Sequence, residues 1–380
     1  MKIIYLIAGT YRAAGMERVL AGKTAWLASH GCEILVATTD QRGRKPAFGF
    51  APQVRHIDLG INYEETNGGS FVSKIVSYPF KQIRHFFALK RLLACEKPDI
   101  VVSMFCNDAG LLPHIPDGRG KVLEIHFSRL KGLQYGRAGL WAVSDRLRSR
   151  HDSRVVARYD KFVVLTEEDR RLWGELDNIC VIPNSKPFEI EGPVEYDRAS
   201  RTVLAAGRLN FQKAFDRLVE AWARLPQSLL SEGWKLEIAG EGEEKDKIEA
   251  LIHELGLEGS VILSGAFPDM RRKYLKSSIY AMTSRYEGLP MVLVEAQTCG
   301  LPIVAMACQC GPRDVVSDGE DGFLVPDGDV DAFARKLAAL MSDEDLRAAM
   351  SQAAVRASGR YDEEIIMPRW KELFENLCAR

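Results

Sequence analysis

The sequence predicts an α/β protein with two doubly wound parallel sheets, and three observations support this prediction. The chain has 380 residues, enough for two domains with sizeable cores. Short apolar segments alternate with segments of helical apolar spacing, as parallel sheets with crossover helices require. The alternation stops at a connector rich in proline and glutamate, residues 186–201, and then starts again.

The first half begins with a strand. Residues 3–8 are apolar, follow Lys2 and lead into a glycine turn. The run is too short to cross a membrane and has no small-residue cleavage site, so we expect a buried strand, not a signal peptide. A helix is expected over 16–31 and a second strand over 32–40. Further strands are expected within 97–106, 121–128, 161–165 and 178–185.

The second half repeats this architecture from residue 202 to a long helical tail over 330–380. We predict a first Rossmann-like domain over 1–183 and a second over 184–360. Residues 361–380 are expected to form a C-terminal helix that packs back on the first domain. Ligands of open α/β sheets bind beyond the carboxyl ends of the strands, so two facing sheets would form a cleft for them.

The composition and the cysteine pattern are those of a soluble protein with reduced thiols. The chain is 46% hydrophobic and 27% charged, which is ordinary for a soluble protein. Its eight cysteines are scattered and complete no metal-ligand pattern, so we expect reduced thiols and a cytoplasmic location. The net charge of −1 conceals an asymmetry. Residues 1–183 hold 27 basic and 19 acidic residues, net +8, whereas 184–380 hold 24 and 33, net −9.

Two segments, 73–97 and 129–161, carry much of the positive charge, interleaved with aromatic residues. One interpretation is that these cations lie on solvated helix faces. The other is that they form a surface for anionic lipid headgroups or for a polyanionic acceptor. The sequence leaves both interpretations open.

Two glutamates in the segment 284–302 suggest a nucleotide-sugar site. Pro290 suits the first position of a helix, and the amino end of such a helix attracts anions. Glu295 lies five residues further on, about 7–8 Å along the axis, comparable with the reach of a diphosphate. Glu287 would then face the transferred sugar, and Glu295 would accept from ribose hydroxyls. A solvent-facing or capping role for Glu295 is the alternative.

Four motifs of the second half occur together and in order. They are the loop 207–213 with Gly-Arg-Leu and Lys213, the turn 239–242, the pair Glu287 and Glu295, and the segment 318–325. With these motifs the second half resembles the nucleotide-binding domain of retaining glycosyltransferases of family 4, which have the GT-B fold. The glycine loop and helix over 9–39 are similar to the amino end of that family.

The resemblance implies roles for the residues of the second half. Arg208 and Lys213 would contact the diphosphate and offset the charge that develops as it leaves. Gly207 belongs to the same loop. Gly288 and Leu289 would offer backbone N–H groups to the sugar or phosphate, beside Glu287 and Glu295.

The resemblance implies no metal and no cofactor, because these cations replace the metal. The acidic segment 327–331 resembles a metal loop but is expected to end a strand and cap the tail helix. In the first domain, Gly15 would let the backbone approach the diphosphate. His126 follows a strand and would lie near the donor sugar, although a purely structural histidine is an equal alternative.

Three positions depart from the family's pattern: Ala14-Gly15, Lys213-Ala214 and residues 183–185. None removes a charged ligand, but each affects the geometry of a loop. The segment 308–314 resembles a subgroup that transfers galactose, N-acetylgalactosamine or N-acetylglucosamine to lipid-linked or surface saccharides.

We therefore expect a retaining transferase for a hexosyl or N-acetylhexosaminyl group, with a UDP-linked donor favoured over a GDP-linked one. The acceptor would be a saccharide or lipid-linked saccharide in polysaccharide or lipopolysaccharide assembly, reached at the inner face of an anionic membrane. No nucleic-acid partner is expected. A nucleotide-sugar 2-epimerase of the same fold and a non-catalytic sugar- or lipid-binding module are the alternatives. A dehydrogenase is disfavoured because no G-x-G-x-x-G follows the first strand.

Overall fold

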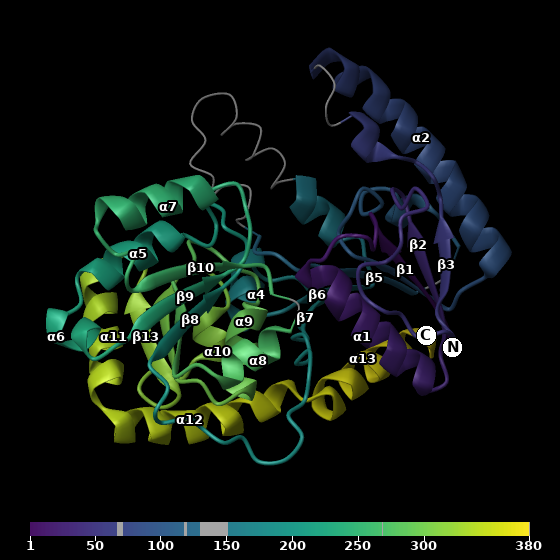
Figure 1. The fold of residues 1–380 in the computed structure, drawn as a ribbon. Coiled ribbons are helices and arrows are strands. Elements are labelled where there is room, and N and C mark those ends of the chain that lie inside the picture. The colour runs from purple at the N-terminus through teal and green to yellow at the C-terminus, as the bar shows by residue number, and fades with distance from the viewer. Residues whose placement is uncertain (67–70, 118–119, 130–150, 268, 380) are drawn as a thin grey trace. The chain divides into compact units, whose positions relative to one another are not determined.

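A computed structural model describes the chain apart from residues 67–70, 118–119, 130–150, 268 and 380 (Figure 1). The chain divides into two compact units. The first comprises Met1–Leu165, Arg170–Pro187 and Glu363–Arg380, and the second comprises Thr166–Asp169 and Phe188–Asp362. Each unit contains one parallel sheet with helices on both faces.

A seven-stranded sheet in the order β3-β2-β1-β4-β5-β6-β7 forms the centre of the first unit. Every neighbouring pair of strands is parallel. The strands are β1 (Lys2–Ile7), β2 (Glu33–Thr38), β3 (Arg55–Asp58), β4 (Ile100–Ser103), β5 (Gly120–Glu124), β6 (Lys161–Val164) and β7 (Ile179–Val181).

Helices cover both faces of this sheet, which explains why its strands are apolar at successive positions. Tyr5 and Val102 face a core that includes Trp370 and Phe374, whereas Ile4 and its neighbours face Leu89 and other residues of α2. The helical elements are α1 (Gly15–Ser29), η1 (Tyr63–Thr66), α2 (Phe71–Glu96), η2 (Leu112–His114), α13 (Glu363–Cys378) and α4 (Glu167–Trp173), whose residues up to Asp169 are grouped with the second unit.

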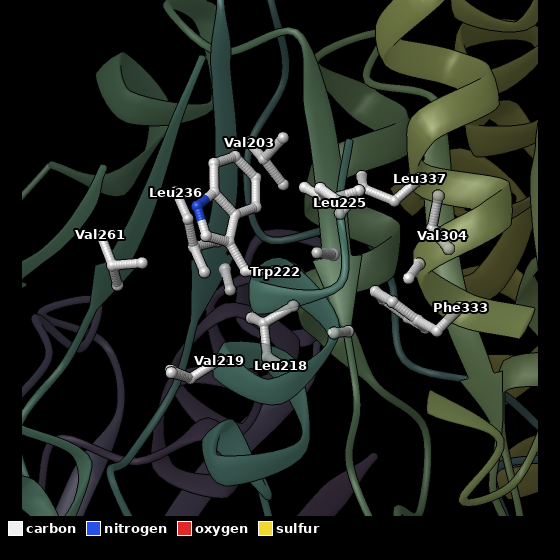
Figure 2. Packing of buried hydrophobic residues seen from close by; sticks show 14 of the residues in the cluster. Val203, Leu218, Val219, Trp222, Leu225, Leu236, Val261, Val304, Phe333 and Leu337 are labelled. Carbon is white, nitrogen blue, oxygen red and sulfur yellow. The ribbon is translucent and has the colours of Figure 1, made fainter. Parts of the chain in front are cut away.

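The second unit has a six-stranded parallel sheet in the order β10-β9-β8-β11-β12-β13. Its strands are β8 (Thr202–Ala206), β9 (Lys235–Ala239), β10 (Val261–Gly265), β11 (Ile279–Met282), β12 (Ile303–Ala307) and β13 (Gly322–Pro326). Figure 2 shows one face of this sheet, where Trp222 and Leu218 of α5 and Phe333 of α11 pack against Val203 and Leu236.

The helices of the second unit cover both faces of its sheet. They are α5 (Phe215–Ala223), α6 (Gln227–Ser231), α7 (Lys245–Glu254), α8 (Met270–Leu275), α9 (Met291–Thr298), α10 (Pro312–Val315), α11 (Val330–Ser342) and α12 (Glu344–Ser358), followed by η3 (Gly359–Tyr361). The expected tail over 330–380 is thus several helices. Of these, α11 and α12 belong to the second unit and α13 to the first.

Each sheet has a point at which its strand order reverses. In the second unit β8 lies between β9 and β11, so the loops after β8 and β11 leave neighbouring strands at the same edge. In the first unit the corresponding loops follow β1 and β4. Ligands of doubly wound sheets bind at such switch points, so the topology alone singles out loops 207–214 and 283–290.

The predicted fold class, two doubly wound parallel sheets, is confirmed. The arrangement of the two sheets about a cleft stays a prediction. Over the described part of the chain, no helix combines the length and the apolar character needed to cross a bilayer.

Candidate functional site

An ion pair joins the two loops at the switch point of the second unit. Lys213 Nζ lies 2.7 Å from Glu287 Oε1, and the two side chains are 18% and 7% exposed. Gln212 Nε2 donates to the carbonyl of Tyr286 at 3.0 Å, beside Glu287. Two residues that the sequence places 74 positions apart therefore form one charged cluster.

Arg285 makes a second set of contacts between the same two loops. Its guanidinium donates to the carbonyl oxygen of Phe211 at 2.7 Å and pairs with Asp216 at 2.6 Å. It also lies 4.2 Å from the centroid of the Phe211 ring. The backbone N–H of Arg285 donates to Gln212 O at 2.8 Å. These contacts hold the loop that carries Arg208 and Lys213 in one conformation.

Arg208 differs from Lys213 in its surroundings. The side chain is exposed, and its guanidinium has no hydrogen bond or ion pair with any residue that the structure describes. Its neighbour Leu209 is fully buried and anchors the loop. Arg208 therefore carries a positive charge that is free for an anionic ligand, whereas the charge of Lys213 is already paired.

The glycine turn 239–242 packs against the backbone of the loop that carries Arg208 and Lys213. A Cβ atom on Gly240 would lie 1.8 Å from the carbonyl oxygen of Gly207, and one on Gly242 would lie 2.2 Å from that of Leu209. The N–H of Leu209 donates to Glu241 O at 2.9 Å. In this structure the glycines of the turn are thus required for backbone packing, apart from any contact with phosphate.

Gly207 is required for a related reason. It has φ of +153°, and a Cβ atom there would lie about 3.1 Å from the side chain of Lys213. The glycine leaves room for the stem of Lys213, which passes over it to reach Glu287.

The helix after the second loop, α9, starts at Met291, so Pro290 is its N-cap rather than its first helical residue. Gly288 and Leu289 lie immediately before this end. Gly311, with φ of +95°, packs against them, since a Cβ atom there would lie 2.8 Å from Gly288 O. The described geometry puts these backbone groups beside Glu287, and their contact with a donor stays a prediction.

Glu295 lies inside α9 and is almost fully buried. The hydroxyl of Tyr274, from α8, donates to its Oε2 at 2.8 Å. Burial and the nearby Glu295 carboxylate raise the pKa of Tyr274 well above its ordinary value, so this hydroxyl keeps its proton as the donor. The alternative of a solvent-facing glutamate is therefore wrong, whereas the contact with ribose stays a prediction.

In the first unit, Gly15 is the first residue of α1 and is exposed. No atom lies within 4 Å of the position of a Cβ atom there, and its φ is not left-handed. The chain itself therefore does not require glycine at this position. The open space beside the backbone is compatible with a ligand at the amino end of α1, where the helix dipole is positive.

His126 lies two residues beyond β5 and contacts a buried ion pair. Its Nε2 is 3.0 Å from Glu124 Oε1, and the Lys23 ammonium group pairs with the same oxygen. Burial alone would raise the pKa of Glu124, but Lys23 and His126 outweigh it and lower this pKa to about 2. Lys23 also lies 3.6 Å from the centroid of the Trp370 ring in α13.

Several of these partners were not expected from the sequence. Lys23 and Glu124 flank His126, Tyr274 holds Glu295, and Gln212 lies beside Glu287. The signal for Lys23 was its place three residues after Leu20 on the buried face of α1. A lysine at an apolar position requires a buried partner, and Glu124 at the end of an apolar strand offers one.

Among the described residues, no group of three or more His, Cys, Asp or Glu side chains is placed to hold a metal ion. In the acidic segment 327–331, the Asp329 carboxylate accepts from the N–H of Ala332 at 2.8 Å and caps α11. This capping role is confirmed. Independence of the reaction from metal stays a prediction.

Comparison with known families matches both halves of the chain. The family described as "Glycosyl transferases group 1" matches residues 189–357, and "Glycosyl transferase 4-like domain" matches residues 14–185. The first match spans the loops with Arg208, Lys213, Glu287 and Glu295. The second spans Gly15 and His126.

An uncharacterized glycosyltransferase of Haemophilus influenzae is 34% identical over 375 residues, 97% of this chain and 99% of that protein. The amylovoran biosynthesis glycosyltransferase AmsD of Erwinia amylovora is 36% identical over 222 residues, 56% of this chain and 62% of AmsD. HepE of Anabaena, solved in complex with UDP and glucose, has a TM-score of 0.73 at 18% identity, covering 99% of this chain and 100% of HepE. The structural similarity and the family matches confirm the GT-B fold.

Replacing Gly240 with alanine should destabilise the second unit. The new Cβ atom would collide with Gly207 O, and the φ of +152° is strained for any L-residue. We expect a loss of at least about 2 kcal/mol in denaturant unfolding. Gly22→Ala is the control, because Gly22 is an exposed position within α1 with nothing within 4 Å and should gain about 0.5–1 kcal/mol. Equal effects of the two changes would contradict the packing role of the turn.

Proposed function

The chain belongs to the group 1 glycosyltransferases, and from this membership we propose that it is a retaining enzyme with a UDP-linked donor. It would transfer a hexosyl or N-acetylhexosaminyl group to a saccharide or lipid-linked saccharide acceptor. The product would enter cell-surface polysaccharide assembly. That the protein is a glycosyltransferase follows from the family, whereas the donor, the acceptor and the stereochemistry are parts of the proposal.

One observation supports the proposed site above the others. The loops after β8 and β11 meet at the switch point and bring Arg208, Lys213 and Glu287 to one edge of the sheet. A nucleoside diphosphate sugar requires positive charge for its phosphates and hydrogen-bond acceptors for its hydroxyls. The free guanidinium of Arg208 supplies the first, and the Glu287 carboxylate supplies the second.

The proposed reaction exchanges one bond at the anomeric carbon for another. The bond from this carbon to the diphosphate oxygen breaks, and a bond to an acceptor hydroxyl oxygen forms on the same face of the sugar. The hydroxyl proton passes to the departing phosphate oxygen. Arg208 and Lys213 stabilise the charge on the leaving diphosphate, so the reaction needs no metal ion.

Glu287 holds Lys213 in position to contact the diphosphate. Its ammonium group lies 2.7 Å from Glu287 Oε1. A lysine ammonium has three donors and can keep the carboxylate while it contacts a phosphate oxygen. Glu287 therefore orients the cation, and its second oxygen, which accepts from Gln212 Nε2 at 3.5 Å, has a further lone pair for a sugar hydroxyl.

The relatives support the donor and acceptor classes. HepE, which shares the fold, was solved with UDP and glucose, and AmsD is named as a glycosyltransferase of amylovoran biosynthesis. We extend a UDP-linked donor and a saccharide acceptor to this chain on that basis. The cytoplasmic face of a membrane is the place of action that fits this chemistry.

Product analysis tests the function. A thermal-shift panel of nucleotide sugars identifies the donor, since binding at about 100 Kd raises stability by about 2.7 kcal/mol. The donor is then incubated with and without oligosaccharide acceptors, in the presence and absence of EDTA. Acceptor-dependent transfer with retained configuration that survives EDTA is the expected result. A 2-epimerised nucleotide sugar formed without acceptor would replace the proposal with the isomerase alternative.

Arg208→Ala and Lys213→Ala should separate catalysis from stability. Loss of either charge should lower kcat by about a hundredfold, as loss of one charge-stabilising contact commonly does. Arg208→Ala should leave unfolding unchanged, because the side chain is exposed and unpaired among the described residues. Lys213→Ala should also lower stability, because it leaves Glu287 buried without its cation. The control is Arg335→Ala, another exposed arginine of the second unit, and near-normal kcat for Arg208→Ala would refute the diphosphate role.

Glu287 and Glu295 should differ in calorimetry with UDP and with the UDP-sugar. Glu295→Gln should weaken binding of both ligands, because ribose is common to them. Glu287→Gln should weaken binding of the UDP-sugar more than that of UDP, because the sugar loses a direct acceptor whereas UDP loses only the ion pair that orients Lys213. Gln keeps the shape of each side chain and limits structural damage. Equal losses for both ligands in both variants would mean that the two roles are wrongly divided.

One face of α2 fits the proposed membrane contact. Phe80, Ile83 and Phe87 are 70%, 57% and 63% exposed and recur at helical spacing, while Leu89 on the same helix is buried. Arg84, Lys90 and Arg91 are exposed among them. Apolar side chains flanked by cations suit the surface of an anionic bilayer. The basic cluster at 146–150 lies outside the described residues, and Lys81 is mostly buried beside Glu65 instead of joining this face.

Vesicle sedimentation tests this face. Vesicles with anionic lipid should bind the protein at low salt and release it at high salt, whereas neutral vesicles should bind little. Phe80→Ser with Phe87→Ser should abolish binding, and Lys90→Gln with Arg91→Gln should weaken it. Ile262→Ser, at an exposed position of the second unit, is the matched control. Undiminished binding of both double variants would rule out α2 as the docking face.

A further inference from the structure

The loops that follow the first three strands of the first unit are tied together at the carboxyl edge of its sheet. Strands β1, β2 and β3 are neighbours, and their loops comprise residues 8–14, 39–47 and 59–66. The N–H of Thr10 donates to Gln41 Oε1 at 2.8 Å and joins the first loop to the second. The N–H of Glu64 donates to Asp40 Oδ1 at 2.8 Å and joins the third loop to the second.

Glu64 lies where these loops meet. One oxygen of its carboxylate accepts from the hydroxyl of Tyr11 and pairs with Arg12, while Arg44 Nη2 lies 3.4 Å from the other oxygen. Burial alone would raise the pKa of Glu64, but Tyr11 and the two guanidinium groups outweigh it and lower this pKa. Glu64 is therefore ionised at neutral pH, and two cations share its single negative charge.

The guanidinium of Arg44 is held in one orientation. It lies 3.2 Å from the centroid of the Tyr11 ring, while Nε donates to Gln41 O at 3.1 Å and Nη2 donates to Asp40 O. Gly9 makes room for this ring, because a Cβ atom there would lie 2.5 Å from Tyr11 Cε1. Nη1 of Arg44 has no hydrogen-bond partner among the residues that the structure describes.

Three cations of this edge have fewer carboxylate partners than their charge requires. The side chains of Arg12 and Arg44 are 61% and 39% exposed, and Lys45 is exposed beside them. Within the described part of the chain, Glu64 is the only carboxylate at ion-pair distance from any of the three. The other carboxylates near these loops are buried or accept from backbone N–H groups; they are Glu17, Asp40 and Asp58.

The amino edge of the same sheet shows the opposite arrangement. There Lys2 and Arg55 each lie within 3.4 Å of both Glu33 and Glu96, so two cations are matched by two carboxylates. The unmatched positive charge therefore lies at the carboxyl edge, where ligands of doubly wound sheets bind.

We infer that Arg12, Arg44 and Lys45 form a subsite for an anionic group of the acceptor, which makes the acceptor an acidic saccharide. This inference rests on the proposed function and names the chemical class of its acceptor. A guanidinium offers its N–H donors in a planar fork that fits a carboxylate or phosphate, and stacking on Tyr11 orients this fork before the ligand arrives. A uronic acid and a phosphate that links a saccharide to lipid are the two sources of such a group.

Calorimetry with three trisaccharides tests the subsite and separates the two sources. The probes are trigalacturonic acid, galactotriose with an anomeric phosphate and neutral galactotriose, titrated into the full-length protein with and without UDP. At least one charged probe should bind about tenfold more tightly than the neutral one at low salt, and high salt should reduce this preference. The preferred probe identifies the source of the anion. Equal affinity for all three, or no measurable binding of either charged probe, would overturn the inference.

Arg12→Gln and Lys45→Gln should each reduce the preference for the charged probe by about threefold or more. Both side chains are exposed, so both variants should fold, and their unfolding temperatures check this. Arg55→Gln is the matched control, because it removes an arginine that is 50% exposed from the opposite edge of the same sheet. It should leave the preference unchanged. An unchanged preference in folded Arg12→Gln and Lys45→Gln would overturn the inference.

UDP binding and transfer assays distinguish this inference from the proposed function. Arg12→Gln and Lys45→Gln should leave the affinity for UDP unchanged, and a loss would assign these cations to the donor and overturn the inference. Equal transfer to neutral and acidic acceptors would also overturn it, while the proposed function would stand. Binding of a charged probe that depends on these cations, without transfer from any donor, would uphold the anion subsite and refute the proposed function.

Discussion

The ion pair between Lys213 and Glu287 is the contact on which the site of the second unit depends. It joins the loops after β8 and β11 where the strand order reverses, and Arg285 and Gln212 tie the same loops together. Two features of the backbone make it possible. Gly207 leaves space for the lysine stem, and Gly240 lets the neighbouring turn approach the loop. Under the proposed function, a ligand that neutralises Arg208 would meet a site whose other cation is already held in place, so little reorganisation would be left for binding.

Much of the fold followed from one physical fact, the burial of strands on both faces. Strands such as 3–7 and 303–307 are apolar at every position because helices cover the sheet on both sides, and that pattern requires crossover connections. The glycine loops and the Glu287–Glu295 spacing then indicated the ligand edge of the second sheet. The helical tail was harder to divide, because the backbone turns at Asp343 and at residues 359–362 carry weak sequence signals.

The contacts of the site that were not predicted from the sequence have one feature in common: each joins residues that are distant in the sequence. Lys23 and Glu124 are separated by 101 positions, and periodicity along a chain carries no information on such a pairing. Tyr274 resembles any buried aromatic residue until its hydroxyl is seen beside Glu295. The turn 239–242 was recognised as a motif in the sequence. Its packing against Gly207 and Leu209 can be seen only in the three-dimensional structure, where the two loops meet.

The position of Trp370 has a consequence for how the chain folds during its own synthesis. The helix α13 supplies Trp370 and Phe374 to a core otherwise built mainly from α1 and from strands β1, β2, β4, β5 and β6, and Cys378 lies beside Met1. During translation these residues leave the ribosome only after all of 188–362 has emerged. We therefore expect one face of the first sheet to stay open to water until α13 has been synthesised, while the second unit can already fold. Chaperones would meet this chain through the apolar residues of β1 and its neighbours, which are synthesised before the second unit and enclosed only after it.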